Sequence, residues 1–226
     1  MEEEKKHILV LLDGEEPSEA FVRHFLIQSA FVIATDGAAK YALKHNIPLD
    51  AIIGDMDSVS PDVRKRFASK GTRIIEDPDQ QSNDFEKALR FIISNPIRDV
   101  VVLGIHGKRT DHLLTNFSVL LRYADSFDKL SAYDATHEHH YLTADSPWHA
   151  FNRPVGTPVS LTPLPEAHGV TTSGLYYPLR NARMVFGERE GLDNLISADT
   201  ATVELIRGAL LVSVPFSTGR LHAGHS

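Results

Sequence analysis

The feature that most constrains the fold is a regular alternation of apolar and amphipathic segments over the first 145 residues. The apolar runs, each with the length and continuity of a buried strand, are 7–13, 29–37, 51–55, 72–77, 99–105, 129–135 and 139–145. The segments with helical spacing are 18–29, 38–46, 61–71, 83–94 and 110–124. Strands that alternate with helices predict a mostly parallel sheet covered on both faces.

Residues typical of helix ends support two of these helices. Pro61 stands near the start of one predicted helix and Gly71 stands just past its end, which is the usual asymmetry. Asn83 is a favourable N-cap for the next helix, and the Glu86 side chain is placed to accept a bond from the Asn83 amide in return.

The pattern changes near residue 146, after which no helical period is found. Prolines separate short β-rich runs at 159–164, 201–206 and 209–214. The fold class predicted is therefore α/β, with a mostly parallel Rossmann-like sheet and flanking helices, followed by a small C-terminal all-β sandwich. The predicted domains are residues 1–147 and 148–226.

Composition excludes several classes of protein. The net charge of −7 argues against a broad surface for nucleic acid, and the absence of cysteine excludes disulfides, thiolate nucleophiles and cysteine-ligated zinc. The acidic N-terminus lacks the pattern of a signal peptide, and no apolar stretch is long enough to span a bilayer. We expect a cytoplasmic protein with no nucleic-acid or membrane partner.

Carboxylates follow the predicted strand at 51–55. Asp55 and Asp57 point the same way if the chain stays extended there, because side chains alternate along a strand. Two facing carboxylates repel each other, and a divalent cation removes that cost. Because Mg²⁺ prefers a few carboxylate oxygens together with waters and phosphates, the pair is interpreted as half of a metal site, with Asp84 as a further ligand. The alternative is that the two aspartates only cap a turn.

The segment GIHGKRTDH at 104–112 resembles a phosphate loop without matching either well-known glycine motif. It places Gly107, Lys108 and Arg109 ahead of a helix N-terminus, where phosphate binds well, and the Arg109 guanidinium suits phosphate oxygens. The alternative is a glycine turn with solvated charges.

Asp36 and Gly37 end the predicted strand at 29–37, and Asp79, Gln80 and Asp84 follow the one at 72–77. Polar residues from four strand ends therefore lie at one edge of the predicted sheet, where open α/β sheets bind ligands.

Two other features are interpreted without a functional role. The run HEHH at 137–140 lacks the helical spacing of a zinc motif, and on a strand its side chains alternate between faces. These histidines are therefore assigned to the surface or the core. Trp148 is interpreted as a packing residue.

Motifs spread along the chain resemble the thiamin pyrophosphokinase (thiamine diphosphokinase) family. They are DGAAKYAL at 36–43, GDMDS at 54–58, PDQQSNDFEKAL at 78–89, GIHGKRTDH at 104–112, GLYYPL at 174–179 and GLDN at 191–194. The resemblance implies that ATP and thiamin react to give thiamin diphosphate and AMP, with the thiamin hydroxyl attacking the β-phosphorus. It also implies Mg²⁺ as the cofactor and ATP as the co-substrate.

The resemblance also implies roles for individual residues. The implied catalytic residues are Asp55, Asp57, Asp84, Arg109 and Asp111, of which the first three hold the metal directly or through water. The implied ATP-binding residues are Asp36, Gly37, Gly107, Lys108, Arg109, Asp111 and His112. The implied thiamin-binding residues are Gln80, Tyr177, Asp193 and Asn194. One aspartate near the hydroxyl receives its proton, and which one is left open.

In the family, part of the thiamin site comes from the β domain of the other subunit, so the resemblance implies a homodimer with shared active sites. Without the resemblance, Tyr177 reads equally well as a core tyrosine. The chain departs from the family pattern at Asn83, Lys108 and Asp193, where threonine, glycine and serine are usual.

Three other functions remain open. A related diphosphokinase acting on a pterin alcohol shares the metal chemistry, although the C-terminal motifs favour thiamin. A non-catalytic binder of thiamin or nucleotide predicts binding without turnover, and a phosphatase or nuclease predicts phosphate release without an acceptor.

Overall fold

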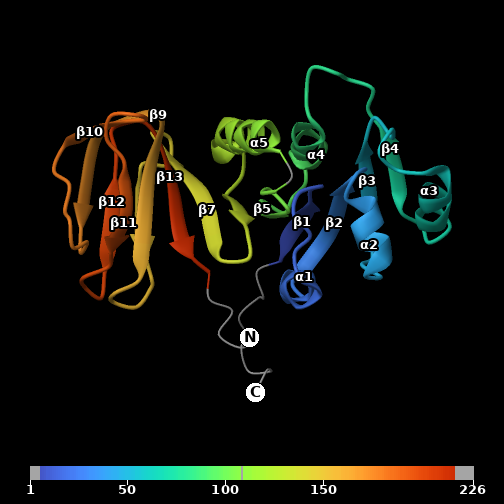
Figure 1. Ribbon diagram of the computed structural model, residues 1–226, viewed down its shortest axis with the longest axis horizontal. Coiled ribbons are helices and arrows are strands. Elements are labelled where there is room, and N and C mark those ends of the chain that lie inside the picture. Colours follow the sequence, from blue (N-terminus) through green and yellow to red (C-terminus); the bar gives the residue numbers. More distant parts are fainter. Residues whose placement is uncertain (1–5, 108, 217–226) are drawn as a thin grey trace. The chain divides into compact units, whose positions relative to one another are not determined.

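The computed structural model describes residues 6–107 and 109–216, and these form two compact units (Figure 1). The first unit contains residues 6–119 and 126–135, and the second contains residues 120–125 and 136–216. The predicted domain boundary at 147–148 stays a prediction.

The first unit is built on parallel strands in the order β4-β3-β2-β1-β5-β6. The strands are β1 (His7–Leu11), β2 (Ser29–Thr35), β3 (Ala51–Gly54), β4 (Arg73–Glu76), β5 (Asp99–Leu103) and β6 (Lys129–Tyr133). The two central strands are almost fully buried because both faces of the sheet are covered. The strand order reverses between β1 and β5, so the loops after these two strands diverge there.

Helices connect the parallel strands and end at recognisable residues (Figure 1). They are α1 (Glu19–Leu26), α2 (Ala39–Lys44), α3 (Pro61–Ala68), α4 (Asp84–Ile92) and α5 (Thr110–Arg122), followed by the short 3-10 helix η1 (Ala124–Ser126). Asn83 caps α4 by accepting a bond from the Glu86 amide at 2.9 Å, as predicted. Pro61 opens α3, and Gly71 lies just beyond it with φ +91°.

The second unit consists of antiparallel strands in the order β7-β13-β9-β12-β8, with β10 and β11 also paired to β9. The strands are β7 (His137–Thr143), β8 (Trp148–Phe151), β9 (Pro158–Ser173), β10 (Ala182–Val185), β11 (Gly191–Leu195), β12 (Ala201–Glu204) and β13 (Arg207–Pro215). Val159, Leu161, Leu210 and Val212 are fully buried in its core. The all-β character is observed, and the two-layer sandwich stays a prediction.

The mostly parallel sheet expected for residues 1–147 is confirmed for β1–β6 and is wrong for β7, the last predicted strand of that half. Parallel pairing is confined to β1–β6, and every described pairing of the later strands is antiparallel, so the fold is a mixed sheet with flanking helices. The predicted strand at 139–145 falls in β7, which pairs with β13. The link between β6 and β7 is too short for a parallel crossover, which needs about a dozen residues.

Among the histidines of β7, the rings of His137 and His139 stack at 6.1 Å, as expected for alternate residues of a strand. The interpretation of Trp148 as a packing residue is wrong, because the side chain is 56% exposed on β8, an edge strand. Within the described residues, no helix has both the length and the apolar character needed to cross a membrane.

Candidate active site

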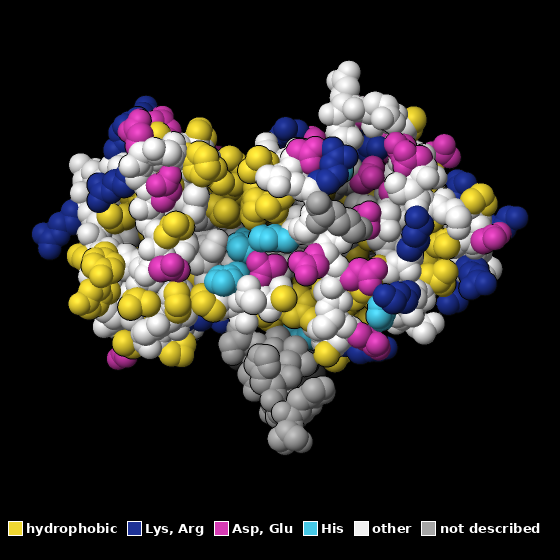
Figure 2. Space-filling model, viewed as in Figure 1, with side chains coloured by type: hydrophobic (Ala, Val, Ile, Leu, Met, Phe, Trp, Pro, Cys, Tyr) yellow, Lys and Arg dark blue, Asp and Glu magenta, His cyan; other side chains and the backbone are white. Residues whose placement is uncertain are grey.

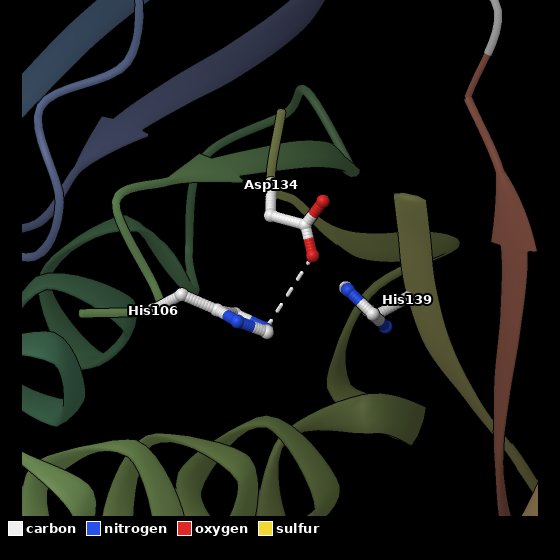
Figure 3. A group of neighbouring side chains, drawn as sticks. All are labelled: His106, Asp134 and His139. Atoms are coloured by element: carbon white, nitrogen blue, oxygen red, sulfur yellow. Dashed lines mark ion pairs between the residues drawn. The ribbon is translucent and has the colours of Figure 1, made fainter. Parts of the chain in front are cut away.

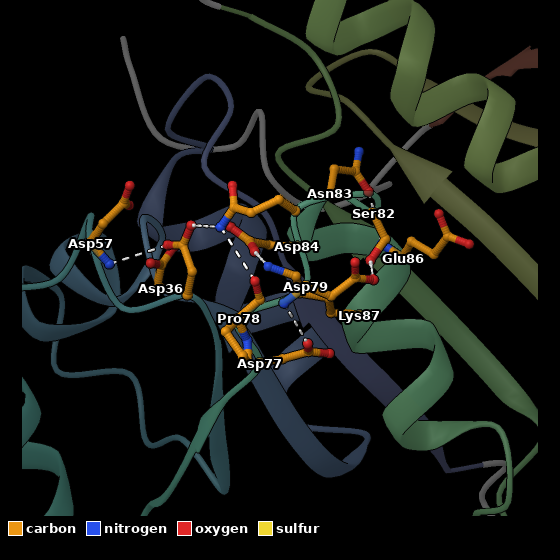
Figure 4. Close-up of polar contacts among 12 residues, drawn as sticks. Asp36, Asp57, Asp77, Pro78, Asp79, Ser82, Asn83, Asp84, Glu86 and Lys87 are labelled. Atoms are coloured by element: carbon orange, nitrogen blue, oxygen red, sulfur yellow. Dashed lines mark hydrogen bonds and ion pairs between the residues drawn. The ribbon is translucent and has the colours of Figure 1, made fainter.

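Three carboxylates converge at the carboxyl ends of β2 and β3. Asp36 directly follows β2, while Asp55 and Asp57 follow β3. Figure 4 shows Asp36 and Asp57 close to each other. One oxygen from each of the three side chains lies within 4.8 Å of the others. This arrangement is compatible with a bound divalent cation, which takes carboxylate oxygens at this kind of spacing.

A turn, rather than an extended strand, brings Asp55 and Asp57 together. Met56 between them has φ +67°, so the chain leaves the extended conformation on which the prediction was based. The Asp57 amide donates to Asp55 Oδ1 at 3.2 Å, which closes a local side-chain turn. The two carboxylates therefore face one region because of the turn, and not because of strand alternation.

Asp36 is the buried member of the three carboxylates. Its residue is only 1% exposed, and its two oxygens accept bonds from the Gly37 amide at 2.6 Å and the Ser58 amide at 3.3 Å. Burial, together with the negative charge of Asp84, raises the pKa of Asp36 to about 6. Gly54 makes room for this carboxyl group, since a Cβ at Gly54 would lie 2.7 Å from Asp36 Cγ.

Asp84 lies beside this group but is not one of the three converging carboxylates. It is the first residue of α4, and its Oδ1 accepts a bond from Lys87 Nζ at 3.0 Å. The Lys87 side chain is 3% exposed, and a cation so deeply buried requires a carboxylate partner. Lys87 thus fixes the orientation of Asp84 next to Asp36.

Gln80 projects from the loop between β4 and α4 toward the same carboxylates. Its Nε2 donates to Asp55 Oδ2 at 3.2 Å. This bond, followed by the bond from the Asp57 amide, lowers the pKa of Asp55, because both favour the ionised carboxylate. Figure 2 shows acidic and basic side chains mixed along this edge of the first unit, near β4 and α4.

Arg109 and Asp111 form an exposed ion pair where α5 begins. Arg109 Nε donates to Asp111 Oδ1 at 3.0 Å, and a terminal guanidinium nitrogen donates to Oδ2 at 2.5 Å. Asp111 Oδ1 also accepts a bond from the His112 amide at 3.0 Å. The guanidinium of Arg109 lowers the pKa of Asp111 to about 2. Lys108, expected to bind phosphate, lies outside the described residues.

The glycines before Arg109 allow two loops to approach each other. Gly104 has φ +78°, and Gly107 has φ +100°. A Cβ at Gly107 would lie 2.6 Å from the Glu15 backbone nitrogen, and the Glu15 amide donates to the His106 carbonyl at 2.6 Å. Glycine is therefore needed at Gly107 for the packing of the loop after β1 against the loop after β5, a role not anticipated from the sequence.

A pocket of about 280 Å³ lies where these two loops meet the loop after β6. It is lined by Glu15, Glu16, Pro17, Ser18, Ala20, Phe21, Gly104, Ile105, His106, Tyr133, Asp134 and Ala135. His106 Nε2 lies 3.6 Å from Asp134 Oδ2 within this wall, and Figure 3 shows the pair. The lining combines aromatic side chains with carboxylates, which disfavours a phosphate group and suits an uncharged or cationic ring.

In the second unit, Asn194 holds the backbone of Tyr177. The Tyr177 amide donates to Asn194 Oδ1 at 3.0 Å, and Asn194 Nδ2 donates to the Tyr177 carbonyl at 2.7 Å. Asn194 is 6% exposed, whereas Tyr177 is 64% exposed, so Tyr177 is not a core tyrosine. Asp193 adopts φ +50°, and its amide donates to Ser160 Oγ at 3.1 Å.

The structure gives Asp36 a different place and adds two residues that the sequence did not single out, Lys87 and Arg90. Asp36 belongs with Asp55 and Asp57, whereas the sequence associated it only with ATP. Lys87 contacts Asp84 three residues earlier, and this helical spacing is a sequence signal that could have indicated it. Arg90 contacts Asp77 and Asp79 in the preceding loop, and no helical spacing indicates that contact.

Comparison with known proteins identifies two matching family models. One describes the catalytic domain of thiamin pyrophosphokinase and matches residues 22–132. The other describes the vitamin B1 binding domain of thiamin pyrophosphokinase and matches residues 149–210. Together they cover both halves of the chain.

Individual relatives agree with these models. Thiamine pyrophosphokinase 1 of Arabidopsis thaliana is 31% identical over 179 residues, which cover 72% of this chain and 64% of the relative. The chain thus spans about 64% of the length of this plant relative. The solved structure of thiamine pyrophosphokinase from Bacillus subtilis has a TM-score of 0.78 at 19% identity and covers 94% of this chain and 100% of its own. The solved structure of yeast thiamin pyrophosphokinase also has a TM-score of 0.78, at 18% identity. The match covers 97% of this chain and 89% of the yeast chain.

Proposed function

The chain belongs to the thiamin pyrophosphokinase family, and from this we propose that it transfers the diphosphoryl group of ATP to the hydroxyl of thiamin. The products are thiamin diphosphate and AMP. The observation that carries the proposal is the convergence of Asp36, Asp55 and Asp57 at the carboxyl ends of parallel strands, inside the segment that matches the catalytic-domain model. The match of residues 149–210 to a vitamin B1 binding domain supports thiamin, rather than a pterin alcohol, as the acceptor.

We assign Mg²⁺ to the converging carboxylates. Asp36, Asp55 and Asp57 are its proposed ligands, and Asp84 acts directly or through water. Magnesium bound there would supply positive charge that offsets the charge on the transferring phosphates. Gln80 and Lys87 hold Asp55 and Asp84 in position through the bonds described above.

We propose that Arg109 binds phosphate oxygens of ATP. Its guanidinium is 65% exposed, and its planar fork, now bonded to Asp111, matches phosphate as well as carboxylate. Asp111 would hold the guanidinium in one orientation until the substrate binds. Gly37, Gly107 and His112 line the same edge and stay proposed nucleotide-binding residues, as does Lys108.

The nucleoside part of ATP is proposed to occupy the pocket beside Phe21 and Tyr133. This pocket lies where the strand order reverses, which is where ligands bind in open α/β sheets. Glu15, Glu16 and Asp134 in its wall would repel phosphates, so the phosphates point away toward Arg109 and the converging carboxylates. Hydrogen exchange tests this assignment: AMP should protect the amides of Glu15, Glu16 and Ser18 and those of residues 104–106.

Thiamin is proposed to bind Gln80 and the segment of Tyr177, Asp193 and Asn194. Tyr177 offers an exposed aromatic face to a cationic ring, and the buried Asn194 fixes its backbone. We propose a homodimer with active sites shared between subunits, as the family resemblance implies. The expected cytoplasmic location stays a prediction.

The reaction products test the proposed function. The protein is incubated with ATP, Mg²⁺ and thiamin, and the nucleotide and thiamin products are separated by chromatography. We expect AMP and thiamin diphosphate in equal amounts, and no turnover when EDTA removes the metal. ADP with thiamin monophosphate would mean that a single phosphoryl group is transferred. AMP formed only with a pterin alcohol would mean that the acceptor is the pterin and not thiamin.

A further inference from the structure

Arg90 forms hydrogen bonds to three residues of the loop that joins β4 to α4. We call residues 77–83 the β4–α4 loop, and Arg90 lies in the second turn of α4 beyond it. Its guanidinium donates to Asp77 Oδ2 at 3.1 Å, to Asp79 Oδ2 at 3.3 Å and to Ser82 Oγ at 3.0 Å. One side chain therefore contacts both ends and the middle of the loop.

The remaining acceptors of the two carboxylates are used within the loop. Asp77 Oδ1 accepts from the Asp79 amide at 3.1 Å, and Asp79 Oδ1 accepts from the Gln81 amide at 2.9 Å. Ser82 Oγ donates to Asp79 Oδ2 at 2.6 Å. Asp77 and Asp79 are thus engaged in holding the loop, and they are not among the three converging carboxylates.

Gln80 lies between the two anchored amides of this loop. The amides of Asp79 and Gln81 are both bonded, which fixes the backbone on either side of Gln80. From this position Gln80 Nε2 reaches Asp55 Oδ2 at 3.2 Å. The geometry of a proposed metal ligand therefore depends on a loop whose shape is set by Arg90.

We propose that Arg90 is a positioning residue: it holds the β4–α4 loop so that Gln80 reaches Asp55, and it keeps Asp77 and Asp79 paired outside the metal site. The catalytic part of this inference rests on the proposed function. Lysine cannot replace arginine here, because only a planar guanidinium offers several donors in fixed directions to partners on different sides. None of these bonds was indicated by the sequence motif at 78–89, which ends one residue before Arg90.

A double-mutant cycle tests the link between Arg90 and Gln80. R90Q and Q80A are measured alone and together for kcat and KM, with R66Q on the exposed side of α3 as the matched control. We expect R90Q to lower kcat/KM by about 10–100-fold, as loss of a group that orients a metal ligand does. The double variant should be no worse than Q80A within about 2-fold, R90K should recover only part of the loss, and R66Q should match the wild type.

Multiplicative effects of R90Q and Q80A would overturn the proposal, because Arg90 would then act independently of Gln80. Wild-type kinetics in R90Q would overturn it as well.

Hydrogen exchange supplies a readout that does not depend on activity. In metal-free protein, R90Q should speed exchange of the amides of residues 79–82, while those of residues 85–92 in α4 stay protected. If the wild type lacks diphosphokinase activity, the proposed function fails, yet this experiment still tests the anchoring of the loop. Unchanged exchange at residues 79–82, or loss of protection throughout α4, would contradict a specific positioning role.

Discussion

Replacing Asp36 with asparagine should stabilise the metal-free protein at neutral pH. Asp36 is 1% exposed, and burial next to the charge of Asp84 raises its pKa from 3.8 to about 6. A pKa shift of this size means that ionised Asp36 lowers the free energy of unfolding by about 3 kcal/mol. Asparagine removes the charge but turns a donor group toward one of the backbone amides, which costs about 1 kcal/mol. The expected net gain is about 1–2 kcal/mol above pH 7.

The sign of the pH dependence follows from the direction of the shift. Because the pKa of Asp36 is higher in the folded state, the folded protein holds this proton more tightly between pH 3.8 and about 6. The contribution of Asp36 to the free energy of unfolding therefore falls as pH rises through that window. The asparagine side chain of the D36N variant cannot titrate, so the stability difference between variant and wild type should grow across the window and level off above it.

Urea unfolding in EDTA at several pH values measures this difference. Far-UV circular dichroism is the suitable signal, because Trp148, the single tryptophan, lies in the second unit and does not report on Asp36. D128N, at an exposed aspartate of the same unit, is the matched control. A difference between D36N and wild type that stays constant from about pH 5 to pH 8 would refute the reasoning.

Magnesium should reverse the order of stability. A ligand that binds only the folded state stabilises it by RT ln(1 + [L]/Kd), or about 2.7 kcal/mol at one hundred times Kd. Wild type should gain this stabilisation, while D36N should gain little and should lose diphosphokinase activity. Equal stabilisation of both proteins by Mg²⁺ would remove Asp36 from the proposed metal site.

Three further substitutions test other parts of the site. D57N should lower kcat by about 100-fold or more, since a metal ligand supplies several kcal/mol of transition-state stabilisation, and its circular dichroism spectrum should match wild type. G54A should destabilise the first unit by about 1–3 kcal/mol in thermal unfolding, because the new Cβ would lie 2.7 Å from Asp36 Cγ. N194A should raise the KM for thiamin about 10-fold with a smaller change in the KM for ATP, because both of its bonds to the Tyr177 backbone are lost.

The elements of the first unit could be predicted from local sequence patterns. The buried parallel strands β1, β3 and β5 lie in apolar runs of the sequence, and caps such as Asn83 act within one turn of the residues they bond. Sheet order could not be obtained in this way. The pairing of β7 with β13 joins segments about 70 residues apart. The spacing of apolar residues within a strand does not indicate which distant strand pairs with it.

The site, too, could be predicted only in part from the sequence. The sequence places Asp36, Asp55, Asp57 and Asp84 at strand and helix ends, since carboxylates after apolar runs can be recognised one segment at a time. Only tertiary structure separates the three converging carboxylates from Asp84, because that choice depends on the +67° φ of Met56 and on the buried partner of Asp84.

The physical reason is the range of the interactions involved. The spacing of apolar residues shows which face of a strand or helix is turned toward the protein core. That face can be recognised from residues close together in the sequence. Convergence of carboxylates, the close approach of Gly54 to Asp36 and the contacts of Arg90 arise between elements that meet only after the chain has folded. Their geometry follows from loop conformation and packing, which a linear pattern does not contain.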